Sequence, residues 1–286
     1  MKSFCSINFL LVVFSVIELP VFSNSILSVE EAVKKGFVKL TIKSKGGYTG
    51  DVIEMKVQNL TGRNLELKIE AGRKLDSKNQ EQQDILVTRE QEFFVNANQP
   101  KTINVFGMCC QANNSAPTAN FEYSLGYMAD SNLIKMARFI DKNKYYSNYS
   151  AQQSVWVVSD NNSIGSIDDE DKEVKNNLRN FVSKLTGKLI PLYEISYRSG
   201  NDGTAMGRAV TIDGVLDYTL LHTCHSTLAI YNERGEVVQL IFENLQSDKG
   251  DYKHYFTFRT KDLPKGIYYA KVNADGLLQK EMKIEF

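Results

Sequence analysis

The sequence has little of several features that mark common functional classes. Lysine plus arginine and aspartate plus glutamate are equal at 34 each, so there is no basic excess. A nucleic-acid-binding protein normally carries such an excess, often along one face, and we expect no nucleic-acid partner. The chain has only three histidines and one tryptophan, and it lacks H-E-x-x-H, G-x-S-x-G and a phosphate-binding glycine loop. No catalytic residue can therefore be assigned from a motif.

Long hydrophobic runs are also scarce, and the clearest one lies at the N-terminus. Residues 7–17 are almost entirely apolar, and Lys2 precedes them. The run is shorter than the ~20 residues that span a bilayer, and its charged start and apolar centre are typical of a signal peptide. We predict that residues 1–23 are a signal peptide, cleaved near Ser23, and that the mature chain begins near Asn24. The protein is then secreted or on the outer cell surface, and it does not span the membrane.

Cysteine is rare as well. Of four cysteines, cleavage of the signal peptide leaves Cys109, Cys110 and Cys224. Disulfides persist in the oxidising environment outside the cytosol. Cys224 can pair with Cys109 or with Cys110, and either pairing leaves one thiol over. A strained ring between the adjacent cysteines is the third option.

The alternation of apolar and polar residues that is typical of strands is abundant. Residues 37–43 and 65–69 alternate with period two, and Asn59-Leu60-Thr61-Gly62 is a turn sequence. The 14 tyrosines and 15 phenylalanines also favour sheets. Short strands at this spacing predict a β-sandwich over residues 24–120. Further strands are predicted at 52–57, 84–88, 92–95 and 101–106.

Residues 121–190 change to helical periodicity. Apolar residues recur at helical spacing after Asp130-Ser131, again over 151–158, and again after the acidic run 168–171. Acidic residues at the start of a helix complement the positive end of its dipole. This explains the acidic run better than an acidic binding surface does, so we predict a segment of short helices here.

From residue 191 the period returns to two, and eight short strands, two of them at 209–212 and 216–221, predict a second sandwich over residues 191–286. Within it, residues 228–238 are a strand, a turn at Gly235 and a strand. Leu263-Pro264-Lys265-Gly266-Ile267-Tyr268 and a basic-apolar terminal strand follow. This pattern resembles the C-terminal sorting domains of type IX secretion and the immunoglobulin-like module of flagellar-hook-capping proteins. The resemblance implies an immunoglobulin-like fold and the secretion machinery as a partner.

The helix predicted over 151–158 carries a second resemblance. Ala151-Gln152-Gln153-Ser154-Val155-Trp156 resembles the Thr-Gln-x-Ala-x-Trp motif of thioester domains in bacterial surface adhesins. The resemblance implies that Gln152 is the acyl residue and that Cys109 or Cys110 is the thiol. Trp156 lies four residues on, on the same helix face, where its indole can shield the bond from water. The alternative is a core-packing helix anchored by Trp156.

A partial calcium-loop pattern follows this helix. Asp160, Asn162 and Asp171 supply oxygen atoms at three of the positions that such a loop uses. A capped loop between two helices explains the same residues. No cofactor is therefore expected, with calcium as the alternative.

One histidine-cysteine cluster lies near residue 224. His222, Cys224 and His225 fall in a predicted strand, where 222 and 224 share a face and 225 points the other way. The three side chains therefore cannot converge on one metal ion without a bulge.

These patterns predict a mainly β chain with a helical middle segment and an immunoglobulin-like C-terminal domain. We expect a secreted or cell-surface, non-catalytic binding or adhesion protein with an unknown extracellular ligand. One alternative is a covalent adhesin with an internal thioester. Another is a secreted enzyme that uses acids and tyrosines of residues 109–200, and such an enzyme needs ionisable groups that converge in a pocket.

Overall fold

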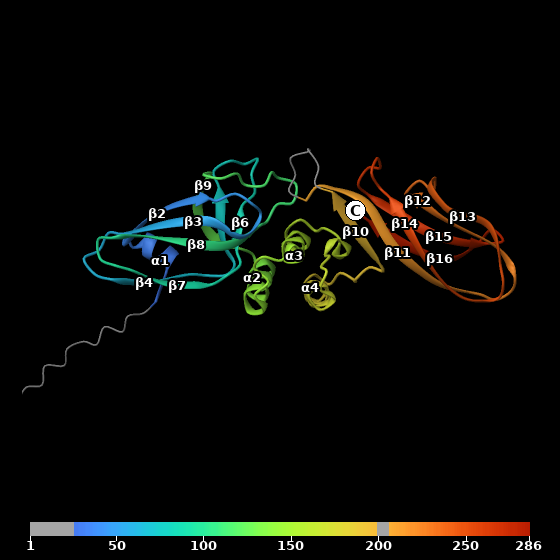
Figure 1. Cartoon of the computed structure of the whole chain (residues 1–286), viewed down its shortest axis with the longest axis horizontal. Coiled ribbons are helices and arrows are strands. Elements are labelled where there is room, and N and C mark those ends of the chain that lie inside the picture. The colour runs from blue at the N-terminus through green and yellow to red at the C-terminus, as the bar shows by residue number, and fades with distance from the viewer. Residues whose placement is uncertain (1–25, 199–205) are drawn as a thin grey trace, which may run out of the picture.

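The computed structural model describes residues 26–198 and 206–286. This part of the chain is mainly β, with one short α-helix in the N-terminal β-region and three between the two β-regions, and this confirms the predicted fold class. The molecule is elongated, with the two β-regions at its ends and three of the helices in the middle (Figure 1). The predicted signal peptide lies outside the described residues. No helix within the described ranges is long and apolar enough to cross a membrane.

Six strands of the N-terminal half form a closed barrel in the order β2-β3-β8-β6-β5-β9. The alternation seen in the sequence sets its register. Ile42 pairs with Met55 and both are buried, whereas the next pair, Lys43 and Glu54, is more exposed. Strand β9 lies beyond residue 120, where we predicted the β-region to end, and it closes the barrel by pairing with β2 and β5. The barrel strands are β2 (Val38–Ser44), β3 (Thr49–Asn59), β5 (Arg73–Ser77), β6 (Ile85–Val87), β8 (Pro100–Cys109) and β9 (Glu122–Met128).

A three-stranded sheet, β1-β4-β7, packs against this barrel. Leu67 of this sheet and Met55 of the barrel belong to the same hydrophobic core. The N-terminal strands thus pack as two layers, as a sandwich does, and the larger layer also closes on itself. The elements added here are β1 (Leu27–Ser28), α1 (Val29–Lys34), β4 (Leu65–Ile69) and β7 (Gln91–Val95).

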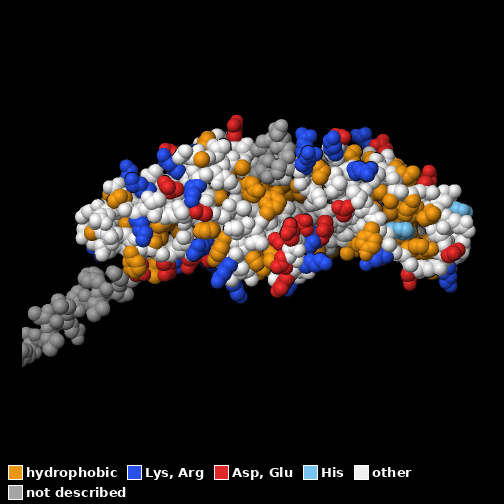
Figure 2. Space-filling view, viewed as in Figure 1, with side chains coloured by type: hydrophobic (Ala, Val, Ile, Leu, Met, Phe, Trp, Pro, Cys, Tyr) orange, Lys and Arg blue, Asp and Glu red, His pale blue; other side chains and the backbone are white. Residues whose placement is uncertain are grey.

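The helical segment contains α2 (Ser131–Asn143), α3 (Tyr149–Ser159), the 3-10 turn η1 (Ile164–Ser166) and α4 (Lys172–Thr186). Helix α3 contacts α2, α4 and strand β8, and it is buried on every side from Ser150 to Val157. Asp130 caps α2 and Asp171 caps α4, as the sequence predicts. Acidic side chains gather near the middle of the molecule, over this segment (Figure 2).

The C-terminal strands form a sandwich of two sheets, β10-β11-β14 and β13-β12-β15-β16. If β10 is numbered as the first strand of this region, the first sheet contains strands 1, 2 and 5. The second sheet contains strands 4, 3, 6 and 7, in that order. An immunoglobulin constant domain has the same seven strands but keeps the fourth in the first sheet, so the order fits the expected immunoglobulin-like class. The strands are β10 (Tyr193–Arg198), β11 (Arg208–Leu220), β12 (Cys224–Asn232), β13 (Val237–Ser247), β14 (Gly250–Arg259), β15 (Ile267–Ala274) and β16 (Leu277–Glu285).

Tyr193 joins the helical segment to this sandwich. Its hydroxyl lies 3.2 Å from the Ser163 hydroxyl and accepts a hydrogen bond from the Glu285 backbone N–H at 3.1 Å. Its ring packs on Gly165, where a Cβ atom would lie 2.9 Å from the ring carbon Cε2. Only glycine therefore allows this close approach, which fixes η1 against β10.

Candidate functional site

The structure brings Gln152 to Cys109. Gln152 Nε2 donates to the Cys109 carbonyl oxygen at 2.7 Å, and the Cys109 backbone N–H donates to Gln152 Oε1 at 2.9 Å. Both residues are fully buried. Cys109 is the last residue of β8, and its N–H also donates to the Tyr48 carbonyl oxygen at 3.1 Å, so the glutamine amide adds to the hydrogen bonds at this end of the strand. Two of the residues that the thioester resemblance pointed to are therefore neighbours.

Trp156 lies on the same helix and is fully buried in the core of the barrel. Its Nε1 donates to Gln83 Oε1 at 3.2 Å, and its indole packs edge-on against the Tyr149 ring, with the centroids 6.3 Å apart. Val155, the preceding residue, belongs to the separate core of the helical segment. Trp156 is thus the anchor that fastens α3 to the barrel.

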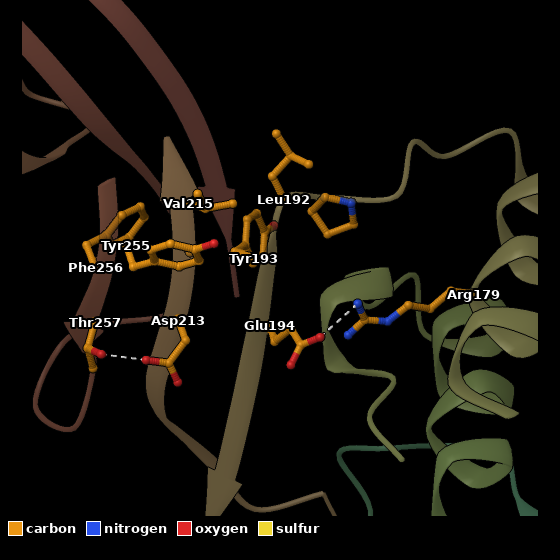
Figure 3. Close-up of a pocket in the computed structure, with 11 residues that line it drawn as sticks. Arg179, Leu192, Tyr193, Glu194, Asp213, Val215, Tyr255, Phe256 and Thr257 are labelled. Carbon is orange, nitrogen blue, oxygen red and sulfur yellow. Dashed lines mark hydrogen bonds and ion pairs between the residues drawn. The ribbon is translucent and has the colours of Figure 1, made fainter. Parts of the chain in front are cut away.

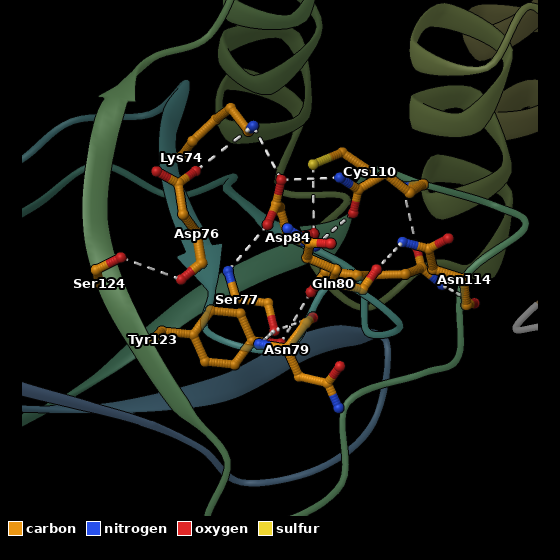
Figure 4. A network of polar contacts seen from close by, with 12 residues as sticks. Lys74, Asp76, Ser77, Asn79, Gln80, Asp84, Cys110, Asn114, Tyr123 and Ser124 are labelled. Carbon is orange, nitrogen blue, oxygen red and sulfur yellow. Dashed lines mark hydrogen bonds and ion pairs between the residues drawn. The ribbon is translucent and has the colours of Figure 1, made fainter.

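Cys110 lies in a polar network around Asp84 (Figure 4). Asp84 Oδ2 accepts hydrogen bonds from Lys74 Nζ at 3.0 Å and Gln111 Nε2 at 2.8 Å, and Cys110 Sγ donates to the Asp84 carbonyl oxygen at 3.3 Å. Burial raises the pKa of the Cys110 thiol to about 12 and raises the pKa of the Cys109 thiol well above its usual range. Both thiols are therefore protonated at neutral pH, which makes them weak nucleophiles.

The three disulfide candidates, Cys109, Cys110 and Cys224, are free thiols in the structure. They belong to three different hydrophobic cores: Cys109 to that of the barrel, Cys110 to that of the helical segment and Cys224 to that of the C-terminal sandwich. Neither predicted pairing with Cys224 is formed, because the chain folds into separate packing units that the spacing of cysteines does not reveal.

Each residue predicted as a possible calcium ligand makes a hydrogen bond within the protein. Asp171 Oδ1 accepts the Glu173 N–H at 2.8 Å as the cap of α4, and Asp160 Oδ2 accepts the Ser159 hydroxyl at 2.6 Å. The loop carbonyl of Asn162 accepts a hydrogen bond from Lys188 Nζ at 2.9 Å. A lysine ammonium thus contacts a carbonyl oxygen of this loop.

A groove that sequence reasoning missed lies where α4 approaches the β10-β11-β14 sheet (Figure 3). Its volume is about 570 Å³, within the range of small-ligand sites. Its floor includes Gly214, where a Cβ atom would lie 2.5 Å from the Phe256 ring. This glycine leaves room for the tip of the Phe256 ring. Strand β11 pairs with β14 without interruption through this position, so it is one strand where we predicted two, 209–212 and 216–221. The groove is lined by Arg179, Pro191, Leu192, Tyr193, Glu194, Asp213, Gly214, Val215, Tyr255, Phe256 and Thr257.

Two of the lining residues form a charged wall. Glu194 Oε1 lies 2.9 Å from Lys175 Nζ and 3.3 Å from Arg179 Nη1. Arg179 Nε donates to the Ile167 carbonyl oxygen at 2.8 Å, while Nη2 is buried and has no hydrogen-bond partner among the described residues. A buried donor left unpaired costs about 1–3 kcal/mol. Arg179 is therefore a rigidly held guanidinium with one donor unused.

The opposite wall carries an exposed aromatic ring. The side chain of Tyr255 is 74% exposed, whereas the neighbouring Phe256 is buried. Beside it, the Thr257 hydroxyl donates to Asp213 Oδ1 at 2.5 Å, and Figure 3 shows both on the same face as Tyr255. A flat ring next to a carboxylate and a hydroxyl offers both apolar and hydrogen-bonding surface to a ligand.

No known protein family matches the chain, and neither does any curated protein. Two matching solved structures contain the CBM51-2 and INT domains of Clostridium perfringens ZmpB, one of them in complex with GlcNAc. They are 11% and 13% identical to this chain, of which they cover 86% and 87%, and the matches span 77% and 79% of their own lengths. The TM-score is 0.17 in both cases, and a likeness this weak supports no conclusion about fold or function.

Proposed function

We propose that this chain is a secreted or cell-surface, non-catalytic binding protein whose extracellular ligand occupies the groove between α4 and the β10-β11-β14 sheet. The observation that carries this proposal is the ring of Tyr255, which stands 74% exposed at the wall of a groove of about 570 Å³. Tyrosine is enriched where proteins bind partners, because it offers a large rigid surface at low cost in conformational entropy. The ligand covers this ring.

The chemistry of the groove favours a carbohydrate. The ring of Tyr255 offers a flat apolar surface, and the carboxylates of Glu194 and Asp213 each have a second oxygen atom that can accept a hydrogen bond. A sugar ring presents an apolar face and a rim of hydroxyl groups that both donate and accept. It therefore matches each of these surfaces at once.

The acids of the groove favour binding over catalysis. Glu194 is held by Lys175 and Arg179, and Asp213 accepts the Thr257 hydroxyl. A general acid or base must exchange its proton with the substrate, whereas one oxygen of each carboxylate is already paired with a neighbouring side chain, which favours the charged form. The competing function is a secreted enzyme that acts on the same ligand.

A glycan array probed with the full chain tests both functions. We expect binding to one group of related glycans, and no released product when the bound glycan is incubated with an excess of protein. Release of new sugar ends by the protein would support the enzyme instead. Absence of binding to every glycan of a broad array would contradict the carbohydrate proposal.

Export also belongs to the proposed function. The N-terminal apolar run supports entry into a secretion pathway, and the seven-stranded C-terminal sandwich is compatible with a sorting domain. We propose that the type IX machinery recognises this domain and delivers the protein to the cell surface or the medium.

We also propose a second candidate function, covalent adhesion, because the Gln152 carboxamide is hydrogen-bonded to the backbone of Cys109. Cys109 Sγ would attack the Gln152 carboxamide carbon, the C–N bond would break, and the amide nitrogen would leave as ammonia with the thiol proton. The intact mass of the mature protein tests this step. A mass lower by one ammonia, restored by Cys109→Ser, supports the thioester. The full calculated mass together with a free Cys109 thiol would exclude it.

A further inference from the structure

Three potential metal ligands converge at one end of the C-terminal sandwich. A ring nitrogen of His222, Sγ of Cys224 and a carboxylate oxygen of Asp275 all lie within 4.8 Å of one another. His222 precedes β12 and Cys224 begins it, whereas Asp275 lies in the turn between β15 and β16. The pairing of β12 with β15 brings these distant segments together.

The backbone holds Asp275 in position. Asp275 and Gly276 form a two-residue hairpin turn with positive φ angles of 47° and 80°, a geometry that favours Asp-Gly. The His225 backbone N–H donates to Asp275 Oδ1 at 2.9 Å, and the Asp275 N–H donates to the His225 carbonyl oxygen at 2.9 Å. These bonds orient the carboxylate toward the start of β12 and leave its second oxygen for another partner.

The loop before β12 is held in a similar way. His222 Nδ1 lies 3.2 Å from the Thr223 carbonyl oxygen, and the Thr223 hydroxyl donates to Asp248 Oδ1 at 3.2 Å. A carbonyl oxygen can only accept, so this contact places the proton of a neutral imidazole on Nδ1 and leaves the lone pair on Nε2. Metal-binding histidines are commonly oriented by such a bond from their other nitrogen.

We infer that His222, Cys224 and Asp275 form a zinc site with water as the fourth ligand. Imidazole, thiolate and carboxylate are all zinc ligands, and three protein ligands plus water complete a tetrahedron. Ligand atoms about 2.0–2.3 Å from tetrahedral zinc lie roughly 3.5 Å apart. Small rotations of His222 and Asp275, both exposed, bring the ligand atoms from the observed spacing to this one. The thiolate and the carboxylate together balance the charge of the ion.

The zinc ion links the loop between the two sheets to the β15–β16 turn. When it binds, the Cys224 thiol gives up its proton to the solvent and no electrons are transferred. Because Cys224 is 5% exposed, the metal reaches it from the side of His222 and Asp275. This site shares no residue with the groove at Tyr255, so it stands independently of the proposed ligand.

Cobalt(II) is the probe, because thiolate–cobalt bonds absorb in the near ultraviolet. The full chain, reduced with a phosphine and freed of metal, is titrated with Co²⁺ and then with Zn²⁺. We expect one equivalent of Co²⁺ to give a thiolate charge-transfer band, and Zn²⁺ to remove it. Cys224→Ser should abolish the band. His222→Gln and Asp275→Asn should each weaken binding by at least the roughly 10- to 100-fold that loss of an outer-shell partner costs.

The control variants distinguish loss of a metal ligand from loss of folding, and binding at Cys224 from binding at other thiols. Asp275→Asn suits the turn, because asparagine is favoured there. His225→Gln changes a neighbouring exposed histidine and should leave the band intact, as should Cys110→Ser. A band that survives Cys224→Ser, or the absence of saturable binding by the wild-type chain, would overturn the zinc site. Circular dichroism of each variant confirms that it is folded.

Discussion

Gln152 shows how a single buried amide can join two elements. Its carboxamide oxygen and nitrogen both bond the backbone of Cys109 at the end of β8. A leucine of similar size would fill the space but would leave the Cys109 carbonyl oxygen without its donor, whereas the Cys109 N–H would keep the Tyr48 carbonyl oxygen at 3.1 Å. A buried polar group left unpaired costs about 1–3 kcal/mol.

We therefore expect Gln152→Leu to lower the free energy of unfolding by about 1–3 kcal/mol, as measured by urea denaturation. Gln80→Leu, a matched change at an exposed position, should stay within about 0.5 kcal/mol of the wild type. Equal stability of the two variants would show that the amide pair contributes little.

Arg73 is a second residue whose burial demands partners. Its side chain is 2% exposed and forms ion pairs with Glu30 at 2.6 Å and Glu70 at 3.0 Å. Hydrogen bonds from Lys34 and Arg73 hold the pKa of Glu30 below its ordinary value of 4.5. The folded chain therefore binds the Glu30 proton less readily than the unfolded chain does.

This difference predicts how stability depends on pH. The contribution of Glu30 is fully present above pH 4.5, and it is lost as the pH falls through the lower pKa of the folded state. Glu30→Gln should lose stability at neutral pH and show a shallower decline below pH 4.5, measured by urea unfolding across that range. Parallel declines for variant and wild type would contradict the assignment.

Among the elements, those with clean periodicity could be predicted from the sequence. The strand predicted over 65–69 is β4, and the three predicted helices are α2, α3 and α4. Strands β5 and β9 were missed because Arg73 is buried by ion pairs and Gly126 interrupts the pattern of β9. The two-strand prediction for β11 was wrong because Gly214 serves packing rather than a turn.

The candidate sites could be predicted only where their residues share a motif. Gln152 and Trp156 stand out because they are four residues apart on one helix, and a resemblance pointed to Cys109. Arg179, Glu194 and Tyr255 come from α4, β10 and β14, and no local pattern links them. Pairing between distant strands sets these neighbours, and a single sequence does not show it.

Helix α3 is the element that fastens the helical segment to the barrel. Trp156 belongs to the barrel core and Val155 to the helical core. Trp156→Ala should remove about 3–5 kcal/mol of stability and lower the thermal midpoint of the barrel and the helices together. The measurement is thermal unfolding followed by far-ultraviolet circular dichroism and by tyrosine fluorescence. Loss of the helical signal alone, with the barrel unchanged, would contradict this coupling.

At the scale of the whole molecule, the two ends of the chain determine the proposed localisation of the protein outside the cell. N-terminal sequencing of the exported protein should show a mature chain that begins near Asn24. In a host that has the type IX machinery, the full chain should reach the surface or the medium, and without that machinery it should remain in the periplasm. Equal export in both hosts would leave the C-terminal domain a purely structural immunoglobulin-like module.

The molecule also presents its proposed ligand site at the junction of two units. The groove takes Arg179 from the helical segment and Tyr255 from the C-terminal sandwich. The Glu194 ion pairs and the Tyr193 hydroxyl hold these units together. A ligand in this groove should therefore raise the thermal stability of the full chain, because it binds only the folded state.

The most direct test is the affinity of the full chain for its best array glycan, compared between Tyr255→Ala and Tyr127→Ala. The two tyrosines are similarly exposed, at 74% and 78%, but Tyr127 lies on β9 of the barrel, away from the groove. Loss of an aromatic contact worth about 1.4 kcal/mol weakens binding about tenfold. We predict this loss for Tyr255→Ala and wild-type affinity for Tyr127→Ala. Equal affinities of the two variants would show that the groove is not the binding site.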